Sequence, residues 1–425
     1  MAATLIERHE TEVTIRIRVS LTRSMLDTEE AIQQALNEAG VLATAEALHQ
    51  FDTDGSPLQI GAQRWTSKGR LPKAYQTPYG EAVVQRHVYQ TGEGGATFCP
   101  LERDARIIIT SRPRFAKQVS FKYGEGAGGR AVQDLAQNHG RHGTLGLVQD
   151  LAAAVGGVAQ AKEETWPYAT PKLDKPVAAL GIGPDGTCLF MTGEGNRQAM
   201  VGAISLYDAA GARLHTVYVA ATPEYGKATF HARLRRAIEH TCGLFPQAKR
   251  VGVADGSEDN RTFLAPYTDK TCVDFHHATG YLSGASRAVF PGQFARRQEW
   301  LEQACQRLKH EEGAAKALLA ELEALPRDGL RETVREGLDR AITYFRNHHE
   351  QMGYAERRAA HLPIGSGVTE AACKTLVKMR LGQGGAKWKE EGAAVVLTLR
   401  ALTYPPGRWE QFWAKVDRYG FPIAA

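Results

Sequence analysis

The sequence predicts an α/β protein whose mixed sheet is interrupted by an α-helical insertion and preceded by a mixed N-terminal region. Short apolar runs separated by turn residues dominate after residue 176, first in direct succession and then alternating with helical patterns. Residues 292–355 instead carry a helical apolar period, and residues 1–165 mix both patterns. A length of 425 residues suits about three domains.

Composition places the chain among ordinary globular proteins. Hydrophobic residues make up 43% and charged residues 23%, and 52 basic against 47 acidic side chains give a net charge of +5. This balance permits nucleic-acid binding but does not demand it. Apolar runs stay below the ~18 residues of a membrane span, and the N-terminus lacks the apolar core of a signal peptide. The six cysteines form no C-x-x-C pair, so we expect reduced thiols in a cytoplasmic protein without membrane partners.

The N-terminal part divides into a mixed and a helical region. We expect residues 1–125 to be α+β, with strands on either side of the breaker Pro78-Tyr79-Gly80. In the helical region 126–170, "AVQDLAQNHGRHGTLGLVQDLAAAVG" predicts helix, Gly-rich turn, helix. As a helix-turn-helix, it would present three candidate DNA contacts: Arg141, His142 and Thr144. An ordinary pair of antiparallel helices fits the same pattern equally well.

A proline-bearing segment, "TWPYATPKLDKP" (165–176), marks a domain boundary. After it, "VAALGIG", "TCLFM", "AMVGAISLY" and "RLHTVYVA" predict strands, "KATFHARLRRAIEHTCG" a helix, and "AKRVGVADG" and "KTCVDF" two further strands. Three antiparallel strands followed by strands alternating with helices are typical of ribonuclease-H-like domains. We assign residues 171–291 and 361–400 to this catalytic domain.

The helical insertion is predicted over residues 292–360. Apolar side chains recur there at steps of four and three, and Pro326 ends the preceding helix. The stripe comprises Leu330, Val334, Leu338, Ile342 and Phe345. The α/β pattern resumes at His361, and residues 401–425 form a C-terminal tail.

Gly181, Gly183 and Gly186 form a glycine motif that could indicate a dinucleotide-binding site. "GIGPDG" matches G-x-G-x-x-G, but a dinucleotide site needs a helix to begin there. The residues that follow predict a strand, so we interpret Pro184-Asp185-Gly186 as a bend between two strands and exclude a nicotinamide site.

Three acids are candidate catalytic and metal-binding residues. Asp185 and Asp255 each follow a buried strand, and Glu370 lies in the first turn of a helix that begins after Gly365-Ser366-Gly367, a turn expected to let the helix approach the sheet closely. Turn chemistry explains Asp185 adequately, and helix-dipole complementarity worth ~0.3–1 kcal/mol explains Glu370. Asp255 fits turn chemistry less well, because "SEDNRTFL" after it predicts a helix. Acids at one sheet edge could instead hold two Mg²⁺ ions ~3.5–4 Å apart for phosphodiester chemistry.

Further polar residues surround these acids in sequence. In "CVDFHHATGYL", Asp274 and His277 follow a strand. They are ordinary polar residues at a strand end, supporting residues near the metals, or contacts to phosphate. A basic stretch after Glu370 contains candidate DNA contacts: Lys374, Lys378, Arg380, Lys387 and Trp388. The cations would neutralise phosphates and the indole would stack on a base. A solvated basic face with a core tryptophan is the alternative.

Taken together, these motifs resemble the bacterial insertion-sequence DDE transposases of the ISKra type. The resemblance covers nearly the whole chain. It includes "YQTPYGEAVVQRHVYQ", "RFAKQVSFKYGEGA", "DGTCLFM", "AMVGAISLYD", "ADGSEDNRTFL", "DFHHAT", "IGSGVTEAACKTLVKMRLGQGGAKW" and "GRWEQFW". As a set they are specific, whereas each acid alone is not.

The resemblance implies a DNA transposase with a ribonuclease-H-like core and the catalytic carboxylates Asp185, Asp255 and Glu370. Asp274 and His277 fall on the C/D-x-x-H motif of Mutator-type members, although His276 stands where an aromatic residue is expected. It implies Mg²⁺, with Mn²⁺ as a substitute, and transposon-end and target double-stranded DNA as partners. It also implies a homodimer or larger assembly in a bacterial cytoplasm. A nuclease without strand transfer and a non-catalytic DNA-binding derivative are the alternatives.

Overall fold

The chain forms two compact units in a computed structural model that describes residues 2–421. The first unit comprises Met1–Ala169 and Glu391–Ala425, and the second comprises Thr170–Glu390. The described residues contain helices, two antiparallel sheets and one mixed sheet, so the predicted α/β class is confirmed. None of the helices in the described residues is long and apolar enough to cross a membrane.

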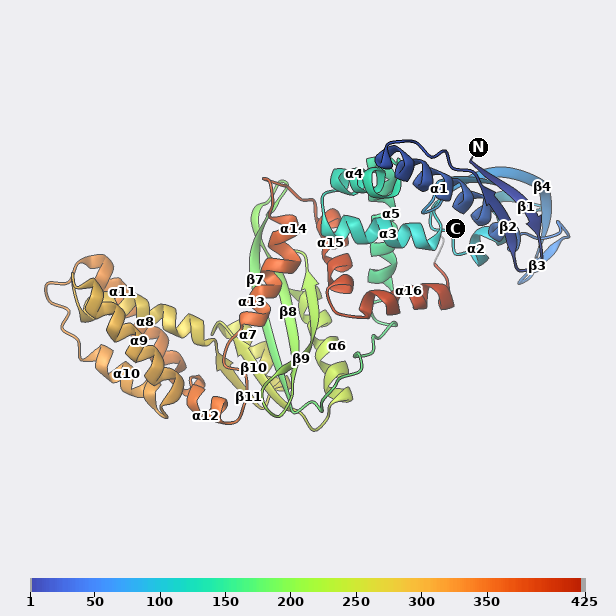
Figure 1. Ribbon diagram of the computed structural model, residues 1–425. Coiled ribbons are helices and arrows are strands. Elements are labelled where there is room, and N and C mark those ends of the chain that lie inside the picture. Colours follow the sequence, from blue (N-terminus) through green and yellow to red (C-terminus); the bar gives the residue numbers. More distant parts are fainter. Residues whose placement is uncertain (1, 422–425) are drawn as a thin grey trace. The chain divides into compact units, whose positions relative to one another are not determined.

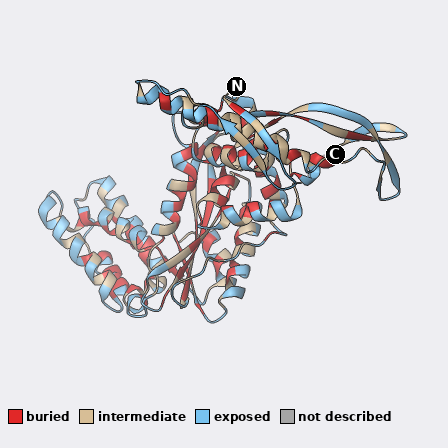
Figure 2. Cartoon of the chain, turned by 45° about the vertical axis from the view of Figure 1, so that its right-hand side comes forward, coloured by how far each residue is buried: buried red, intermediate tan, exposed pale blue. Residues whose placement is uncertain are grey.

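The first unit begins with two small antiparallel sheets around a long helix (Figure 1). Its first elements are β1 (Ala3–Arg8), β2 (Val13–Ile17), α1 (Met25–His49), β3 (Leu58–Ile60), β4 (Gln63–Gln76), β5 (Glu81–Thr91), β6 (Gly94–Phe98) and α2 (Pro100–Asp104). The second sheet has the order β3-β4-β5-β6, and the predicted breaker at Pro78-Tyr79-Gly80 separates β4 from β5. Figure 2 shows that many residues of this second sheet are exposed, as most residues of β4 are.

The rest of this unit is helical: α3 (Pro113–Glu125), α4 (Gly128–His139), α5 (Leu145–Ala161), α15 (Glu390–Thr403) and α16 (Arg408–Tyr419). Helix α15 differs from its predicted place in the catalytic domain. Arg400 is 1% exposed and donates to the Gly124 carbonyl over 2.7 Å, and Val395 lies against Gly156. These groups are buried only because α15 packs against α3 and α5. The local sequence around residue 400 does not reveal this packing.

The second unit is built on one mixed sheet with the order β11-β10-β7-β8-β9. Strands β7 (Ala179–Met191), β8 (Gly195–Tyr207) and β9 (Arg213–Ala221) are antiparallel, whereas β10 (Lys249–Ala254) and β11 (Lys270–Val273) run parallel to β7. Helix α6 (Ala228–Leu244) covers one face through Phe230 and Leu234, which pack on Ile182 and Ile204.

The predicted bend at Pro184-Asp185-Gly186 is wrong, because β7 continues through it. Asp185 pairs with Val201 of β8 in an unbroken register. Pairing of β7 with β10 ends at Ile182, so β7 is an edge where Pro184 lies. A proline costs no ladder hydrogen bond at an unpaired strand edge. The exclusion of a dinucleotide motif holds, since a strand and not a helix follows Gly183.

Apart from β11, helices make up most of the stretch between β10 and the last acid. They are α7 (Glu258–Leu264), α8 (Phe275–Val289), α9 (Phe294–His310), α10 (Ala314–Glu323), α11 (Glu332–His348) and α12 (Tyr354–Ala359). Helix α8 belongs to the same apolar cluster as α9–α11, so the helical part begins near residue 275 and not at 292. Helices α8 and α11 approach closely at two glycines: a Cβ on Gly337 would lie 3.3 Å from the Gly284 carbonyl.

The chain then returns to the sheet as one bent helix. It consists of α13 (Gly367–Ala372), a π-helical turn (Cys373–Lys378) and α14 (Met379–Leu381). Figure 1 shows α13 and α14 over β7 and β8. Ile182 faces α6, and side chains alternate along a strand, so Gly183 and Asp185 face α13.

Candidate functional site

Two parallel strands bring the first two acids to the same end of the sheet. The last paired residues of β7 and β10 are Ile182 and Gly252. Asp185 lies three residues beyond the first (185 − 182) and Asp255 three residues beyond the second (255 − 252). Because Ile182 and Gly252 are paired and each acid lies three residues further on, the two acids lie next to each other on neighbouring strands.

A glycine in β7 lets the helix that carries the third acid pack closely on this strand. Thr369 of α13 donates to the Gly183 carbonyl over 3.2 Å. A Cβ on Gly183 would lie only 2.6 Å from Thr369 Oγ1 and 2.9 Å from the Val253 carbonyl. In the turn before the helix, a Cβ on Gly367 would meet no described atom within 4 Å, and one on Gly365 would lie 3.4 Å from Asp274 Oδ2. The close approach of α13, and with it the place of Glu370, depends on Gly183.

The three acids influence one another electrostatically. Burial raises the pKa of Asp185, and the nearby charges of Asp255 and Glu370 raise it further, although the Gly186 amide donates to it over 2.7 Å. Burial also raises the pKa of Asp255, but hydrogen bonds outweigh it and the net pKa lies below the usual value. A cluster of like charges of this kind favours a bound cation.

Asp255 owes its lowered pKa to donors on the helix that follows it. The Ser257 amide and the Asn260 side chain each donate to Asp255 Oδ1 over 3.0 Å, and the charge of His277 lowers the pKa further. Ser257 is also the N-cap of α7. The first residues of the predicted helix after Asp255 therefore also hold the Asp255 carboxylate in position.

A buried acid and a serine connect the third acid to the rest of the site. Asp274 is fully buried, caps α8 by accepting from the His277 amide over 2.7 Å, and accepts from the Ser366 amide. The Ser366 hydroxyl lies 2.8 Å from Asp274 Oδ2 and 2.8 Å from Glu370 Oε1. A hydroxyl has one proton, so it can donate to only one carboxylate at a time.

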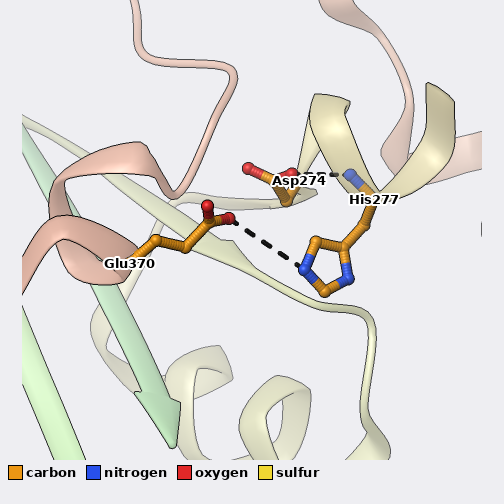
Figure 3. Close-up of side chains that lie close together, drawn as sticks. All are labelled: Asp274, His277 and Glu370. Atoms are coloured by element: carbon orange, nitrogen blue, oxygen red, sulfur yellow. Dashed lines mark hydrogen bonds and ion pairs between the residues drawn. The ribbon is translucent and has the colours of Figure 1, made fainter. Parts of the chain in front are cut away.

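His277 completes this corner of the site (Figure 3). Its Nε2 lies 4.0 Å from Glu370 Oε1, and both side chains are nearly half exposed. One potential ligand atom from each of Asp274, His277 and Glu370 lies within 4.8 Å of the others. Because three donors already occupy the Asp274 oxygens, Asp274 fits the predicted supporting role better than direct ligation.

The donor set fits a hard divalent cation. Asp185, Asp255 and Glu370 offer carboxylate oxygens, the ligands that Mg²⁺ and Mn²⁺ prefer, with the single imidazole of His277 at the edge. The pKa of Asp185 is raised mainly by burial and further by its acidic neighbours Asp255 and Glu370. The residues present therefore suit the magnesium that the sequence predicts.

A groove of about 490 Å³ begins at Asp185 and Glu370. It is lined by Asp185, Glu370, Cys373, Lys374, Lys378 and Gln383, among others. Glu370, Lys374 and Lys378 follow at steps of four and therefore lie on the same side of the helix, and both lysines belong to its π-helical turn. Both lysines are exposed, as expected of phosphate contacts.

The other basic candidates of this stretch lie differently. Arg380 is buried and its guanidinium lies 5.1 Å from the Trp388 ring centroid. The Trp388 indole donates to the Leu381 carbonyl over 2.9 Å, and its backbone pairs with the edge of β7. Arg380 and Trp388 thus hold the Gly-rich segment in place, and of this group Lys387 remains exposed.

The three helix-turn-helix candidates lie in the first unit. The predicted helices exist as α4 and α5, but Arg141 is 7% exposed and donates to the Thr77 carbonyl over 3.0 Å and to Gln76 over 2.8 Å. Its role is to anchor the turn to the end of β4, a contact no local pattern reveals. Thr144 caps α5 by accepting from the Leu147 amide, and His142 is exposed.

Ser366, Asn260 and Cys373 were not predicted to belong to the site. Cys373 Sγ donates to Asp185 Oδ2 over 3.5 Å. Two of the three carry a local signal: Ser366 stands four residues before Glu370, and Asn260 five residues after Asp255. Cys373 carries none, because its partner lies on a distant strand.

No protein-family model matches this chain, and no curated protein shows significant similarity to it. The functional argument therefore depends on the geometry described above. That geometry defines an α/β protein with acidic side chains next to a groove that two lysines help to line.

Proposed function

We propose that the chain is a divalent-metal-dependent DNA transposase. The observation that carries the proposal is the convergence of Asp185, Asp255 and Glu370 at one end of the sheet, next to a groove lined by Lys374 and Lys378. Carboxylates that hold cations beside phosphate-binding lysines are what phosphodiester cleavage and transfer require.

The order of the sheet supports a ribonuclease-H-like core. In β11-β10-β7-β8-β9 only β8 runs against the other strands, the acids lie on β7 and directly after β10, and the third acid comes from a later helix. The helices between residues 275 and 359 then form an insertion before that last acid. Ligand sites of open α/β sheets generally lie at the carboxyl ends of strands.

In this proposal each side chain has a distinct task. Asp185, Asp255 and Glu370 hold Mg²⁺ or Mn²⁺, which when bound polarises the phosphate and lowers the pKa of water. Lys374 and Lys378 hold the phosphate backbone along the groove. His277, next to Glu370, is placed to accept or donate a proton at the reacting oxygen.

The step from nuclease to transposase depends on the sequence motifs. The resemblance to ISKra-type transposases spans both units, including the first unit with its α4–turn–α5 element. We propose that this unit recognises transposon ends, that the freed 3′-hydroxyl attacks target DNA, and that at least two copies assemble to join two ends.

The test is cleavage and strand transfer with labelled end-bearing DNA in Mg²⁺. We expect wild type to nick the end and join it to target DNA, and we expect Asp185→Asn, Asp255→Asn and Glu370→Gln each to lose at least ~100-fold in rate, because each removes a ligand charge. Glu312→Gln, an exposed acid on the helical part, is the matched control. Cleavage without joined product would favour the nuclease, and full activity of the three variants would refute the site.

A further inference from the structure

An exposed aromatic ring stands on an ordered loop of the second unit. Tyr225, between β9 and α6, is 87% exposed. The loop is held on both sides: Glu224 accepts from the Phe230 amide over 2.9 Å, and Lys227, with a left-handed φ of 55°, lies 3.7 Å from Asp259. An aromatic ring displayed in this way offers a stacking surface without the cost of ordering it.

A cation covers one face of this ring. The Arg197 guanidinium lies 4.0 Å from the Tyr225 ring centroid and also pairs with Glu194. The high exposure of Tyr225 leaves the other face of the ring open to solvent. Cationic side chains interleaved with aromatic rings are the usual means of binding unpaired nucleotides, since every base has a π-face and every nucleotide a phosphate.

A second pair of this kind lies at the same end of the β7–β8 hairpin but on its other face, because Phe190 alternates with Leu189 along β7. Phe190 is 42% exposed, and Lys387 Nζ lies 5.9 Å from its ring centroid. Phe190 is the neighbour in β7 of Leu189, which pairs with Arg197. Trp388, in contrast, is held by Arg380 and the Leu381 carbonyl, so its ring is less suited to stacking.

Arg197, which covers Tyr225, lies close to Asp185 along the hairpin. Leu189, opposite Arg197, is four residues from Asp185 on β7. At a rise of about 3.3 Å per residue this separation is roughly 13 Å, a few nucleotides of single strand. A DNA strand that enters the groove at Asp185 can therefore extend along the hairpin to Arg197 and Tyr225.

We propose that Tyr225, backed by Arg197, is a stacking platform for an unpaired DNA base next to the cut. The ligand class is thus DNA with a frayed or single-stranded end, bound with little sequence preference. The inference rests on the proposed function, which supplies DNA as the partner.

The experiment compares two probes in EDTA: a blunt duplex, and the same duplex with a short 3′ thymidine tail that contains one 2-aminopurine. We expect wild type to bind the tailed probe more tightly and to quench 2-aminopurine fluorescence by stacking. Tyr225→Ala should weaken binding of the tailed probe about tenfold, or about 1.4 kcal/mol, and leave the blunt duplex unchanged. Tyr225→Trp should retain tail binding, because it keeps a stacking ring.

Phe294→Ala is the matched control, because Phe294 is 66% exposed on α9 and Arg297 lies 5.5 Å from its ring. Equal losses in Tyr225→Ala and Phe294→Ala, no loss in Tyr225→Ala, or unquenched fluorescence would each overturn the platform. Binding in EDTA does not involve cleavage, so the two proposals fail separately. A wild type that prefers the tail but cuts nothing in Mg²⁺ would refute the transposase and not the platform.

Discussion

At the scale of single residues, the site depends on polar groups that share partners. The Ser366 hydroxyl stands between Asp274 and Glu370, and Asp274 also fixes the backbone before α13. The spacing of Ser366 and Glu370 is visible in the sequence. The link to Asp274 is not, because it joins positions on opposite sides of the helical insertion.

Removing the Ser366 hydroxyl should weaken metal binding. We expect Ser366→Ala to raise the dissociation constant for Mn²⁺ about fivefold, since one hydrogen bond that orients Glu370 is lost and such a bond is worth ~1 kcal/mol. Electron paramagnetic resonance of free Mn²⁺ measures this without catalysis. Ser283→Ala, an exposed serine of α8, should bind as wild type does. Equal affinities of both variants would contradict the role of Ser366.

Glu102 should make stability depend on pH in the acid range. Burial raises its pKa, but Lys73 at 2.8 Å, Tyr75 at 2.7 Å and Arg86 at 3.2 Å outweigh burial, and the net pKa lies below the usual glutamate value of 4.5. A lowered folded-state pKa means that the stabilisation is present above the unfolded pKa and is lost as the pH falls through the folded one.

Glu102→Gln should therefore lower the free energy of unfolding by about 2 kcal/mol at pH 7 and by less near pH 3. Urea titrations at several pH values measure the difference. The exposed acid Glu93 provides the control Glu93→Gln, which should leave the pH dependence unchanged. A constant difference between wild type and Glu102→Gln from pH 7 to pH 3 would count against this linkage.

At the scale of elements, β7 and the bent helix over it decide where the acids meet. The strand continues through Pro184 because its β10 edge is already unpaired there. The π-helical turn keeps Thr369, Cys373 and Val377, again at steps of four, on the buried side. The continuation of β7 and the π-helical turn both depend on segments far away in the sequence. Local turn signals therefore mispredict the first, and local helix signals miss the second.

The contact of α13 with β7 can be tested through Gly183. We expect Gly183→Ala to destabilise the second unit by ~1–3 kcal/mol and to reduce Mn²⁺ affinity, because its Cβ meets Thr369 Oγ1 and the rigid Val253 carbonyl. Thermal unfolding and Mn²⁺ titration measure the two effects. Gly243→Ala in α6, where a Cβ meets no described atom within 4 Å, should be neutral or slightly stabilising. Wild-type affinity in Gly183→Ala would show that α13 does not need this contact.

At the scale of the whole molecule, the first unit is built from both ends of the chain and the second from one continuous stretch. Residues 170–390 should therefore fold alone, unfold cooperatively and bind Mn²⁺ as the full chain does, because the acids and their supporting residues all lie within them. Circular dichroism during thermal unfolding and Mn²⁺ titration provide the readouts.

Residues 1–169 should in contrast need residues 391–425, since α15 supplies Arg400 and the apolar side chains that cover α3 and α5. Expressed alone, this fragment should aggregate, and co-expression with residues 391–425 should restore solubility. A soluble, cooperatively folded fragment 1–169 would contradict this dependence.

The sequence by itself determined the α/β class, most helices and strands, the place of Glu370 in a first helical turn and a start of α7 directly after Asp255. These features follow from side-chain period, caps and turn residues, which act over a few neighbours. Tertiary structure decided that β7 runs straight through Asp185, that Gly183 admits α13, and that Arg141 and Arg380 are buried. These outcomes depend on strand register and on contacts between distant segments, and register across a sheet is fixed by all of its partners together.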